Sequence, residues 1–272
     1  SNPVRDANFL GSLMTISVFK NVVDNQSIKK FFEYYEVYDD TIDDRPDVFS
    51  KHPIWDKGNW PQLELQKILD QVLDHDYVIE ETIFNKSKIS FNLHVDSLDG
   101  DPDVLYKNVL IPIHFEGPSS TVIFENKWHG SATRFSKVKL SPFFYRLPTH
   151  AGVLEPVEDI RLLTDLSNYD ITKEELDVLI AKRDGSIDVL GKSEERTSDY
   201  SLVEGYNPSL KFDKQLHEQY LNHIPIESLD GLTVGKVVDW RIGDVITFDR
   251  QHLHCAGSGH SVKYGITVFT KQ

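Results

Sequence analysis

The chain is poor in cysteine, since Cys255 is the only one among its 272 residues. A single cysteine excludes an intrachain disulfide bond and any zinc site built on paired cysteines. It fits a reducing compartment, so we expect a cytoplasmic protein. Cys255 directly follows His254. On a strand the two side chains point to opposite faces, which favours a small, buried, apolar role for Cys255.

Long apolar runs and an excess of positive charge are also missing. No stretch approaches the roughly 20 apolar residues that a transmembrane helix needs, and no signal peptide is visible. Asp and Glu outnumber Lys and Arg by 43 to 29, which gives a formal net charge of −14. Such a charge argues against a nucleic-acid backbone or an anionic membrane as the main partner. We therefore expect no nucleic acid and no membrane as partners. The partner that we do expect is a small-molecule substrate, and the oligomeric state stays unknown.

Several common catalytic patterns are absent as well: the chain has no internal repeat, no Gly-rich phosphate cradle and no Gly-x-Ser-x-Gly elbow. The informative segment is one where apolar and polar residues alternate: Phe91, Leu93 and Val95 with Asn92, His94 and Asp96. A strand has a side-chain period of two, so the polar residues share one face. His94 and Asp96 then have Cβ atoms roughly 6–7 Å apart, close enough to bind one ion. His-x-Asp alone is a weak signal in a chain with 11 histidines, so its context decides.

A second candidate segment, Trp240–Phe269, carries His254. Gly243-Asp244 signals a turn, and the β-branched and aromatic residues after it predict a strand that begins at Val245 and brings His254 to its far end. Glycines at positions 257 and 259 predict a reversal, after which a second strand runs back. If the reversal is a two-residue hairpin, Lys263 lies directly opposite His254.

Two histidines and one carboxylate on one face of a metal leave the opposite positions open, as in the facial triad of non-haem Fe(II) oxygenases. With His94-x-Asp96, the distant His254 and a basic residue nine positions after it, the chain resembles the Fe(II)/2-oxoglutarate-dependent dioxygenases of the phytanoyl-CoA and proline hydroxylase-like branch. The sequence Gly-Asp-x-Ile-x-Phe-x-x-x-x-Leu-His, which ends at His254, strengthens the resemblance. The motifs lie in about residues 78–131 and 235–272.

The resemblance implies a mainly β fold with helices (α+β), namely a double-stranded β-helix, or jelly roll, whose mouth holds Fe(II). It implies that His94, Asp96 and His254 bind the iron and form the catalytic centre, and that Lys263 pairs with the distal carboxylate of the cosubstrate 2-oxoglutarate. Thr267 and Asn108 are further candidates for cofactor binding. The implied reaction uses O2, releases succinate and CO2, and hydroxylates the substrate. In this fold the turn before Lys263 crosses between sheets, which leaves the hairpin register open.

Lys263 is a departure from the family pattern, because many members have Arg there, often followed two residues later by Ser or Thr. Here that later position is Gly265, and Thr267 is the nearest hydroxyl on the same face. Lysine offers the charge of arginine without its bidentate fork. If Lys263 is not the anchor, the next candidate cations are Arg134, Arg161 and Arg250.

We expect one domain over residues 1–272, because β barrels and sandwiches of this length are often single units. Residues 1–77 would form an N-terminal helical support. Residues 78–148 and 236–272 would form the jelly-roll core. Residues 149–235 would form a helical insertion, which is either a lid that helps to choose the substrate or a surface decoration.

Capping residues and apolar spacing predict helices outside the core. Asp24 and Ser27 offer the chemistry of a helix start, and Pro61 fits the first turn of a second helix. Thr172-Lys173-Glu174-Glu175 is a capping box that opens a third helix, which we expect to stop at Asp184-Gly185. A fourth helix is predicted over residues 213–223.

Three other interpretations are open at this stage. A cupin-like isomerase or cosubstrate-free dioxygenase would keep the triad but would not need Lys263, and succinate release distinguishes it. A non-catalytic barrel that binds a metal or small ligand would fill the fourth metal position with a protein ligand, since structural sites are closed. Finally, the three triad residues could fail to meet in space.

Overall fold

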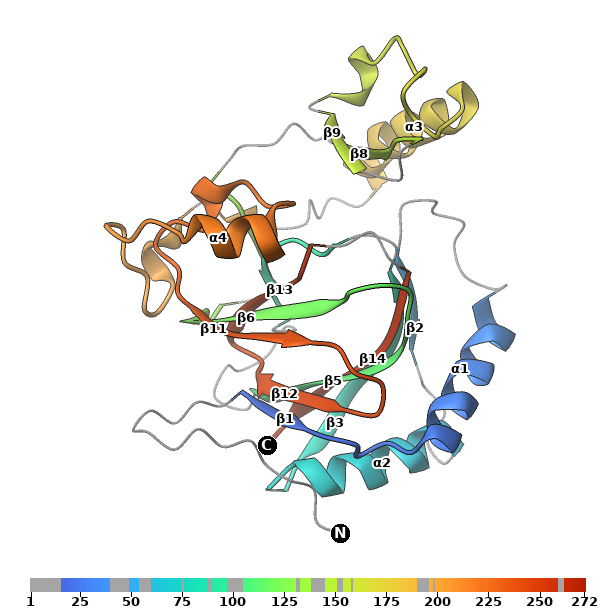
Figure 1. Cartoon of the computed structure of the whole chain (residues 1–272), viewed down its shortest axis with the longest axis vertical. Helices are drawn as coiled ribbons and strands as arrows, with labels where there is room; N and C mark the ends of the chain where they lie inside the picture. Colours follow the sequence, from blue (N-terminus) through green and yellow to red (C-terminus); the bar gives the residue numbers. More distant parts are fainter. Residues whose placement is uncertain are drawn as a thin grey trace.

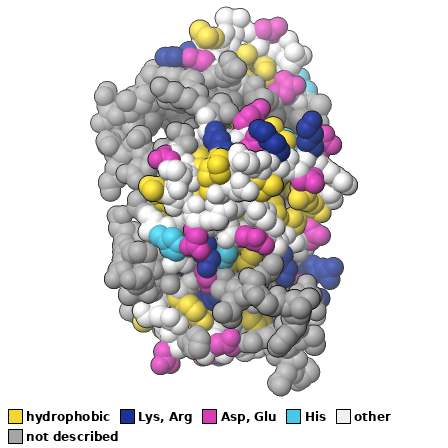
Figure 2. Space-filling view, turned by 90° about the vertical axis from the view of Figure 1, so that its left-hand side faces the viewer, with side chains coloured by type: hydrophobic (Ala, Val, Ile, Leu, Met, Phe, Trp, Pro, Cys, Tyr) yellow, Lys and Arg dark blue, Asp and Glu magenta, His cyan; other side chains and the backbone are white. Residues whose placement is uncertain are grey.

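The computed structural model describes residues 16–39, 49–53, 60–74, 76–87, 90–96, 105–130, 133–137, 145–150, 154–157, 159–189, 196–197, 199–258 and 262–272. Two six-stranded β-sheets form the centre of the molecule, and two helices lie against one of them (Figure 1). On the face shown in Figure 2, the described acidic, basic and apolar side chains are mixed. Within the described ranges, no helix is both long and apolar enough to span a membrane.

The two sheets are built as follows. The first contains, in spatial order, β1 (Ser17–Phe19), β12 (Val245–Asp249), β5 (Leu105–Phe115), β14 (Lys263–Lys271), β3 (Val78–Ser87) and β2 (Phe49–Pro53). The second contains β10 (Arg196–Thr197), β7 (Thr133–Phe135), β4 (His94–Val95), β13 (His252–Ala256), β6 (Ser120–Lys127) and β11 (Val234–Asp239). A separate pair joins β8 (Tyr145–Pro148) to β9 (Leu154–Val157). Neighbouring strands are antiparallel except for β10 and β7.

Eight of these strands wind between the two sheets in a fixed order. The chain runs from β3 in the first sheet to β4 in the second, back to β5 and over to β6. After a long connection, β11 leads to β12, β13 and β14, which again alternate between the sheets. The resulting spatial orders, β12-β5-β14-β3 and β4-β13-β6-β11, are those of a jelly roll. The fold is a double-stranded β-helix. The prediction from the sequence is confirmed.

Strand β14 shows how the side-chain period of two creates both a core and a cavity. Ile266 and Val268 are fully buried on the outer face of the first sheet, against α1 (Asn25–Asp39) and α2 (Trp60–Val72). The alternate residues of β14 point to the inner face and line a cavity between the sheets: Lys263, Gly265, Thr267 and Phe269. One strand therefore stabilises the fold with one face and serves the site with the other.

The first two helices begin where the sequence predicts. The backbone N–H of Ser27 donates to Asp24 Oδ1 at 2.8 Å, which satisfies a free donor in the first turn of α1. Pro61 lies in the first turn of α2, where its missing N–H costs nothing.

The later helices begin where the sequence predicts, but the third helix ends later than predicted. In α3 (Lys173–Val189), the backbone N–H of Glu175 donates to Thr172 Oγ1 at 3.2 Å and that of Thr172 donates to the Glu175 carboxylate at 2.8 Å. This is the predicted capping box. The predicted stop at Asp184-Gly185 is wrong, because an internal glycine costs only about 1 kcal/mol relative to alanine and α3 continues to Val189. The fourth helix is α4 (Lys214–Leu216), continued by a π-helical turn to Leu221.

The strand that was predicted to run from Val245 to His254 is broken in the structure. β12 ends at Asp249 and β13 begins at His252, and the two strands belong to different sheets. The single-strand prediction is therefore wrong, because the chain turns at residues 250–251 to cross between the sheets.

The hairpin register that placed Lys263 opposite His254 is also wrong. Lys263 pairs with Ser87 on β3 and with Phe115 on β5, whereas His254 lies on β13 in the other sheet. The chain crosses between sheets before β14, as the jelly-roll winding requires. The tip of this reversal, residues 259–261, lies outside the described residues.

Segments outside the predicted core contribute strands to it. β1 and β2, from residues 1–77, form the two edges of the first sheet, and β10, from residues 149–235, lies at an edge of the second. In contrast, β8, β9 and α3 form a small unit that lies apart from the two sheets (Figure 1). This unit has its own apolar core of Leu147, Ile160, Leu176 and Leu179. The division into support, core and lid stays a prediction.

Candidate metal centre

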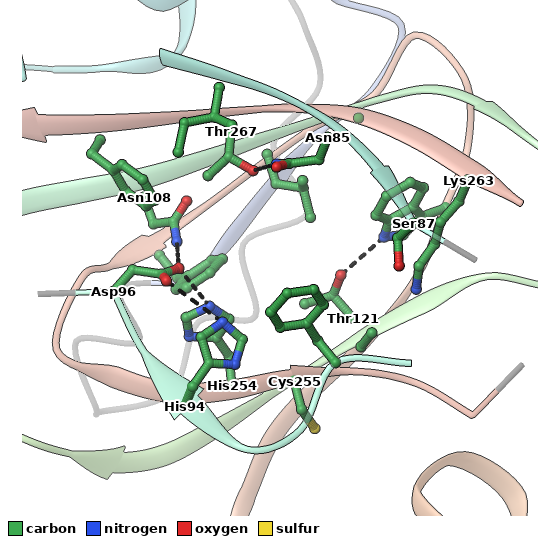
Figure 3. Close-up of a pocket in the computed structure, with 18 residues that line it drawn as sticks. Asn85, Ser87, His94, Asp96, Asn108, Thr121, His254, Cys255, Lys263 and Thr267 are labelled. Atoms are coloured by element: carbon green, nitrogen blue, oxygen red, sulfur yellow. Dashed lines mark hydrogen bonds and ion pairs between the residues drawn. The ribbon is translucent and has the colours of Figure 1, made fainter. Parts of the chain in front are cut away.

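A cavity of about 130 Å³ lies between the two sheets. The first sheet contributes one face of β3, β5 and β14, and the second contributes side chains of β4, β6 and β13. Polar side chains stand at both ends of the cavity. Figure 3 shows His94, Asp96 and His254 at one end and Lys263 at the other.

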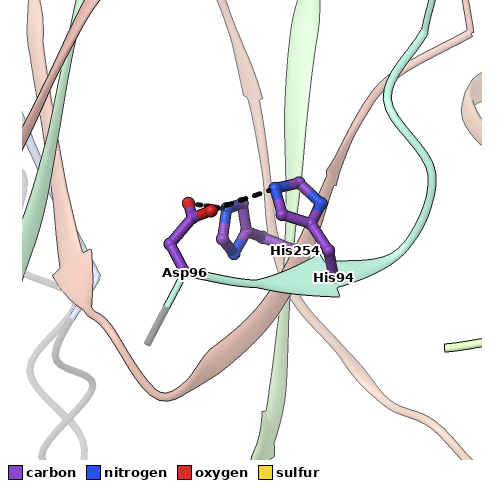
Figure 4. A group of neighbouring side chains, drawn as sticks. All are labelled: His94, Asp96 and His254. Atoms are coloured by element: carbon purple, nitrogen blue, oxygen red, sulfur yellow. Dashed lines mark hydrogen bonds and ion pairs between the residues drawn. The ribbon is translucent and has the colours of Figure 1, made fainter. Parts of the chain in front are cut away.

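The three predicted metal ligands converge at one point. Asp96 Oδ2 lies 2.9 Å from His254 Nε2, and Asp96 Oδ1 lies 3.5 Å from His94 Nε2. The centroids of the two imidazole rings are 4.3 Å apart. One ligand atom from each residue lies within 4.8 Å of the other two. Figure 4 shows the three side chains pointing toward one another. The interpretation in which the triad never meets is therefore excluded.

Strand pairing brings these side chains together. β4 and β13 are antiparallel neighbours in the second sheet, and His94 is paired with His254. Side chains of paired residues stand on the same face of a sheet with Cβ atoms about 4.5–5.5 Å apart. Asp96 follows His94 by two residues and so returns to that face, as the alternation in the sequence predicted.

Backbone carbonyls determine which imidazole nitrogen faces the centre. His94 Nδ1 lies 2.7 Å from the carbonyl oxygen of Asn92, and His254 Nδ1 lies 3.0 Å from that of His252. A carbonyl oxygen only accepts hydrogen bonds, so each Nδ1 donates to its carbonyl and Nε2 is the ring nitrogen left for a metal. Both Nε2 atoms face Asp96. Hydrogen bonds of this kind orient histidines that bind metals.

The chemistry of the donor set fits a metal with open coordination positions. Burial and, to a smaller extent, the nearby His254 lower the pKa of His94 from 6.5 to about 4, so the imidazole is in the neutral form that binds metals. Among the described residues, no other His, Cys, Asp or Glu joins the group. Two nitrogen ligands and one carboxylate fit an ion such as Fe(II) and leave other positions free, unlike a closed structural site.

Asn108 on β5 holds the carboxylate of the triad. Its Nδ2 donates to Asp96 Oδ2 at 2.9 Å, and the residue is almost fully buried. A carboxylate only accepts hydrogen bonds, so the amide orientation is fixed and Asn108 Oδ1 points elsewhere. That oxygen is buried and has no hydrogen-bond partner within the described part of the chain. The sequence drew attention to Asn108, but its contact with Asp96 emerges only in the fold.

Lys263 is a buried cation with no carboxylate beside it in the described ranges. Only 8% of its surface is exposed, and its Nζ lies 5.4 Å from the centre of the Trp240 ring. Burial lowers the pKa of Lys263 from 10.5 to about 8. Because a buried charge is stable only when a counter-charge accompanies it, this end of the cavity suits an anionic ligand.

Thr267 stands on the cavity wall and bonds to a residue that the sequence did not mark. Its Oγ1 accepts from Asn85 Nδ2 at 2.7 Å. Asn85 lies on β3 and pairs with Gly265, so it reaches the cavity only because β3 and β14 are neighbours. The sequence did not predict Trp240 and Thr121 either. Trp240 Nε1 donates to Thr121 Oγ1 at 2.9 Å, and the Trp240 ring lies beside Lys263. No motif marks these residues, since strand register alone brings them to the site.

The three arginines that were the alternatives to Lys263 contact other groups. Arg250 is fully buried and pairs with Glu80 at 2.6 Å, and Arg161 pairs with Asp159 in the small unit. The Arg134 guanidinium lies 5.9 Å from the ring of Phe91. None of the three is among the residues that line the cavity, so Lys263 is its lining cation.

Comparison with protein-family models and with curated proteins gave no match. Among solved structures, the chain is similar to the epimerase SnoN in complex with Fe3+, alpha ketoglutarate and nogalamycin RO, with a TM-score of 0.46 and 8% identity over 95% of this chain and 79% of that chain. HygX from Streptomyces hygroscopicus with nickel and 2-oxoglutarate bound gives a TM-score of 0.44 and 11% identity, over 95% and 82%. EctD from S. alaskensis with 2-oxoglutarate and 5-hydroxyectoine gives 0.45 and 9%, over 95% and 72%. Because this likeness is weak, the fold is assigned from strand order and the site from its side chains.

Proposed function

We propose that this chain is an Fe(II)- and 2-oxoglutarate-dependent oxygenase that acts on a small molecule. The observation that carries the proposal is a single cavity with an open-sided His-Asp-His group at one end and a buried, uncompensated lysine at the other. 2-Oxoglutarate matches both ends, because its 2-oxo acid group can chelate a metal while its distal carboxylate pairs with a cation.

His94, Asp96 and His254 would hold the metal through Nε2, a carboxylate oxygen and Nε2. When bound, the iron would supply the activation of O2, which belongs to the metal and its cosubstrate rather than to protein side chains. The protein contributes orientation. The carbonyls behind the two Nδ1 atoms and the amide of Asn108 hold all three ligand side chains before a metal arrives.

Lys263 would pair with the distal carboxylate of 2-oxoglutarate in a charge-assisted hydrogen bond. The Trp240 ring beside its Nζ would keep water away from this pair. Thr267 and Asn85 line the same cavity, where the cosubstrate would lie, and the Thr267 hydroxyl can donate to it. These contacts would supply the counter-charge that buried Lys263 requires.

Asn108 is less suited than Thr267 to contact the cosubstrate, although it was one of our sequence candidates. Its Nδ2 already donates to Asp96, and 2-oxoglutarate carries only hydrogen-bond acceptors, so Asn108 Oδ1 has nothing to accept from it. A contact with 2-oxoglutarate would require the amide to leave Asp96. The role of Asn108 that its geometry favours is to hold the carboxylate.

The reaction we propose is hydroxylation of the substrate with release of succinate and CO2. A cupin-like reaction without cosubstrate would leave the buried charge of Lys263 without a purpose. A non-catalytic metal barrel is disfavoured because no fourth protein ligand joins the triad in the described ranges.

The test is a screen of small molecules under air with Fe(II), ascorbate and 2-oxoglutarate, read out as succinate. We expect a hit to give succinate in proportion to hydroxylated product. Asp96→Ala should abolish turnover and leave the circular dichroism spectrum unchanged, because Asp96 is partly exposed and contributes little to the core. Substrate conversion that proceeds without 2-oxoglutarate would instead establish the cupin-like alternative.

A further inference from the structure

Arg250 is the most completely buried charged residue described, with none of its surface exposed. It lies in the turn between β12 and β13, four residues before His254. Lysine and arginine are almost never fully buried unless they are paired. Each of the three nitrogens of its guanidinium donates at least one hydrogen bond within the protein. It does not line the cavity, so neither substrate nor cosubstrate explains its burial.

The hydrogen bonds of Arg250 lead to the metal centre. Nη2 and Nε both donate to the backbone carbonyl of Asp96, at 3.1 and 3.4 Å. Nη1 donates to Glu80 Oε2 at 2.6 Å and to the carbonyl of Thr270 at 3.3 Å. The face of the guanidinium lies 5.1 Å from the centre of the Phe269 ring. One planar group therefore ties the backbone of Asp96 to β3 and β14 of the first sheet.

Asp96 has particular need of such a tether. It stands just past the end of β4, a strand of only two residues. The neighbouring ligand His94 is held by pairing with both Arg134 and His254 across the sheet. Asp96 lies beyond this ladder, so its backbone position depends on contacts of another kind.

Arg250 also belongs to the segment that carries the third ligand. The turn at Arg250 sets where β13 begins, and β13 presents His254. By bonding to the carbonyl of Asp96, Arg250 links the segment of one ligand to the segment of another. A shift of this turn would change the distance between Asp96 and His254, which is now 2.9 Å between Oδ2 and Nε2.

We propose that Arg250 is a positioning residue of the metal centre, which fixes Asp96 relative to His254 through the Asp96 backbone carbonyl. The inference rests on the proposed metal site. Outer contacts that orient metal ligands typically change metal affinity by about 10- to 100-fold when they are removed. The planar fork is essential to this role, because a lysine ammonium at the same position cannot bond to Glu80 and to Asp96 in this fixed geometry.

The test compares Arg250→Lys and Arg250→Gln with Lys271→Met. Lys271 is a matched control because it pairs with the same Glu80 carboxylate, yet no contact joins it to Asp96 among those described. Co(II) is the probe, and both its affinity and its visible absorption spectrum are measured on folded protein, alongside urea unfolding. We expect both Arg250 variants to bind Co(II) about 10-fold or more weakly and with an altered spectrum. Lys271→Met should keep the affinity and spectrum of the original protein.

The outcomes separate this inference from the proposed function. If the original protein does not bind Co(II), the metal site itself is wrong and this inference falls with it. If Arg250→Lys unfolds more easily but binds Co(II) with unchanged affinity and spectrum, Arg250 is only structural. Equal losses in Arg250→Lys and Lys271→Met would place the effect on Glu80 and would also overturn the inference.

A measurement on the unaltered protein covers the case in which both Arg250 variants fail to fold. The Nε–H of Arg250 gives its own NMR signal, and it donates to the carbonyl of a metal ligand. We expect this signal to shift when Zn(II) is titrated into the site. A signal that stays in place while the imidazole signals of His94 and His254 move would contradict the positioning role.

Discussion

Two buried cations of this protein, Arg250 and Lys263, are accommodated in opposite ways. Arg250 is fully buried and satisfied by Glu80 and by two backbone carbonyls. Lys263 is nearly as buried, but among the described residues it faces the ring of Trp240 and no carboxylate, and burial lowers its pKa to about 8. A paired charge holds a structure together, whereas an unpaired charge at the end of a cavity is kept for a ligand. The difference separates a positioning residue from a binding residue.

The largest expected effect on folding comes from removing the paired cation. Arg250→Met should lower the free energy of unfolding by about 3–5 kcal/mol, because it removes the buried donor of the Asp96 and Thr270 carbonyls and one of the two cations that pair with Glu80. Urea denaturation at neutral pH measures this. Lys271→Met is the control, since its partly exposed ion pair with the same Glu80 is worth only about 0–1 kcal/mol. Equal losses in the two variants would remove the distinction between them.

Removing the unpaired cation, Lys263, should raise the free energy of unfolding rather than lower it. The pKa of Lys263 falls from 10.5 to about 8, so keeping its charge in the buried site costs about 3 kcal/mol. Lys263→Met retains the length of the side chain and removes this cost. We expect the variant to be more stable than the original protein by up to about 3 kcal/mol in urea at pH 7 without ligand. A loss of stability in Lys263→Met would show that the lysine has a partner in the folded protein.

The difference in unfolding free energy between Lys263→Met and the original protein, here called the stability gap, should depend on pH in a way that identifies Lys263. Below pH 8 the lysine is charged in both the folded and the unfolded chain, so its full cost is present. Between pH 8 and 10.5 the folded protein releases the proton first, and the original protein gains stability relative to Lys263→Met. The gap should therefore close over this window. A gap that is constant from pH 7 to 10 would contradict the lowered pKa.

The smallest expected effect concerns the ring beside Lys263. Trp240→Leu removes the aromatic face that lies 5.4 Å from Nζ, a cation–π contact worth about 0.5–2 kcal/mol. We expect the affinity of the metal-loaded protein for 2-oxoglutarate to fall by roughly 2- to 30-fold. Trp240→Phe keeps an aromatic face and should lose less. If the two variants behave alike, the ring acts through its volume or through its bond to Thr121.

The candidate site could be predicted in part because two of its ligands are local in sequence. His94 and Asp96 share a face through the period of two, and no tertiary information is needed to see it. The helix starts at Asp24 and Thr172 followed from capping chemistry in the same way. The partner His254 and the role of Lys263 came from a resemblance of motifs rather than from geometry.

What the sequence did not predict depends on which sheet each strand joins. The local pattern around Arg250 reads as one continuous strand, because nothing in Asp249-Arg250-Gln251 signals a turn as strongly as glycine or proline would. The chain crosses between sheets there because the jelly-roll winding demands it. For the same reason Asn85 and Trp240 could not be identified in advance, since they reach the cavity only through strand pairing and packing.

A titration of 2-oxoglutarate into the Co(II)-loaded protein, followed by calorimetry, tests the central claim most directly. A charge-assisted hydrogen bond from Lys263 in a partly dry cavity contributes about 1.5–3 kcal/mol, so Lys263→Met should raise the dissociation constant for 2-oxoglutarate roughly 10- to 150-fold. The Co(II) affinity of the variant should stay unchanged, because the triad does not involve Lys263. Equal affinities of the original protein and Lys263→Met for 2-oxoglutarate would contradict the account.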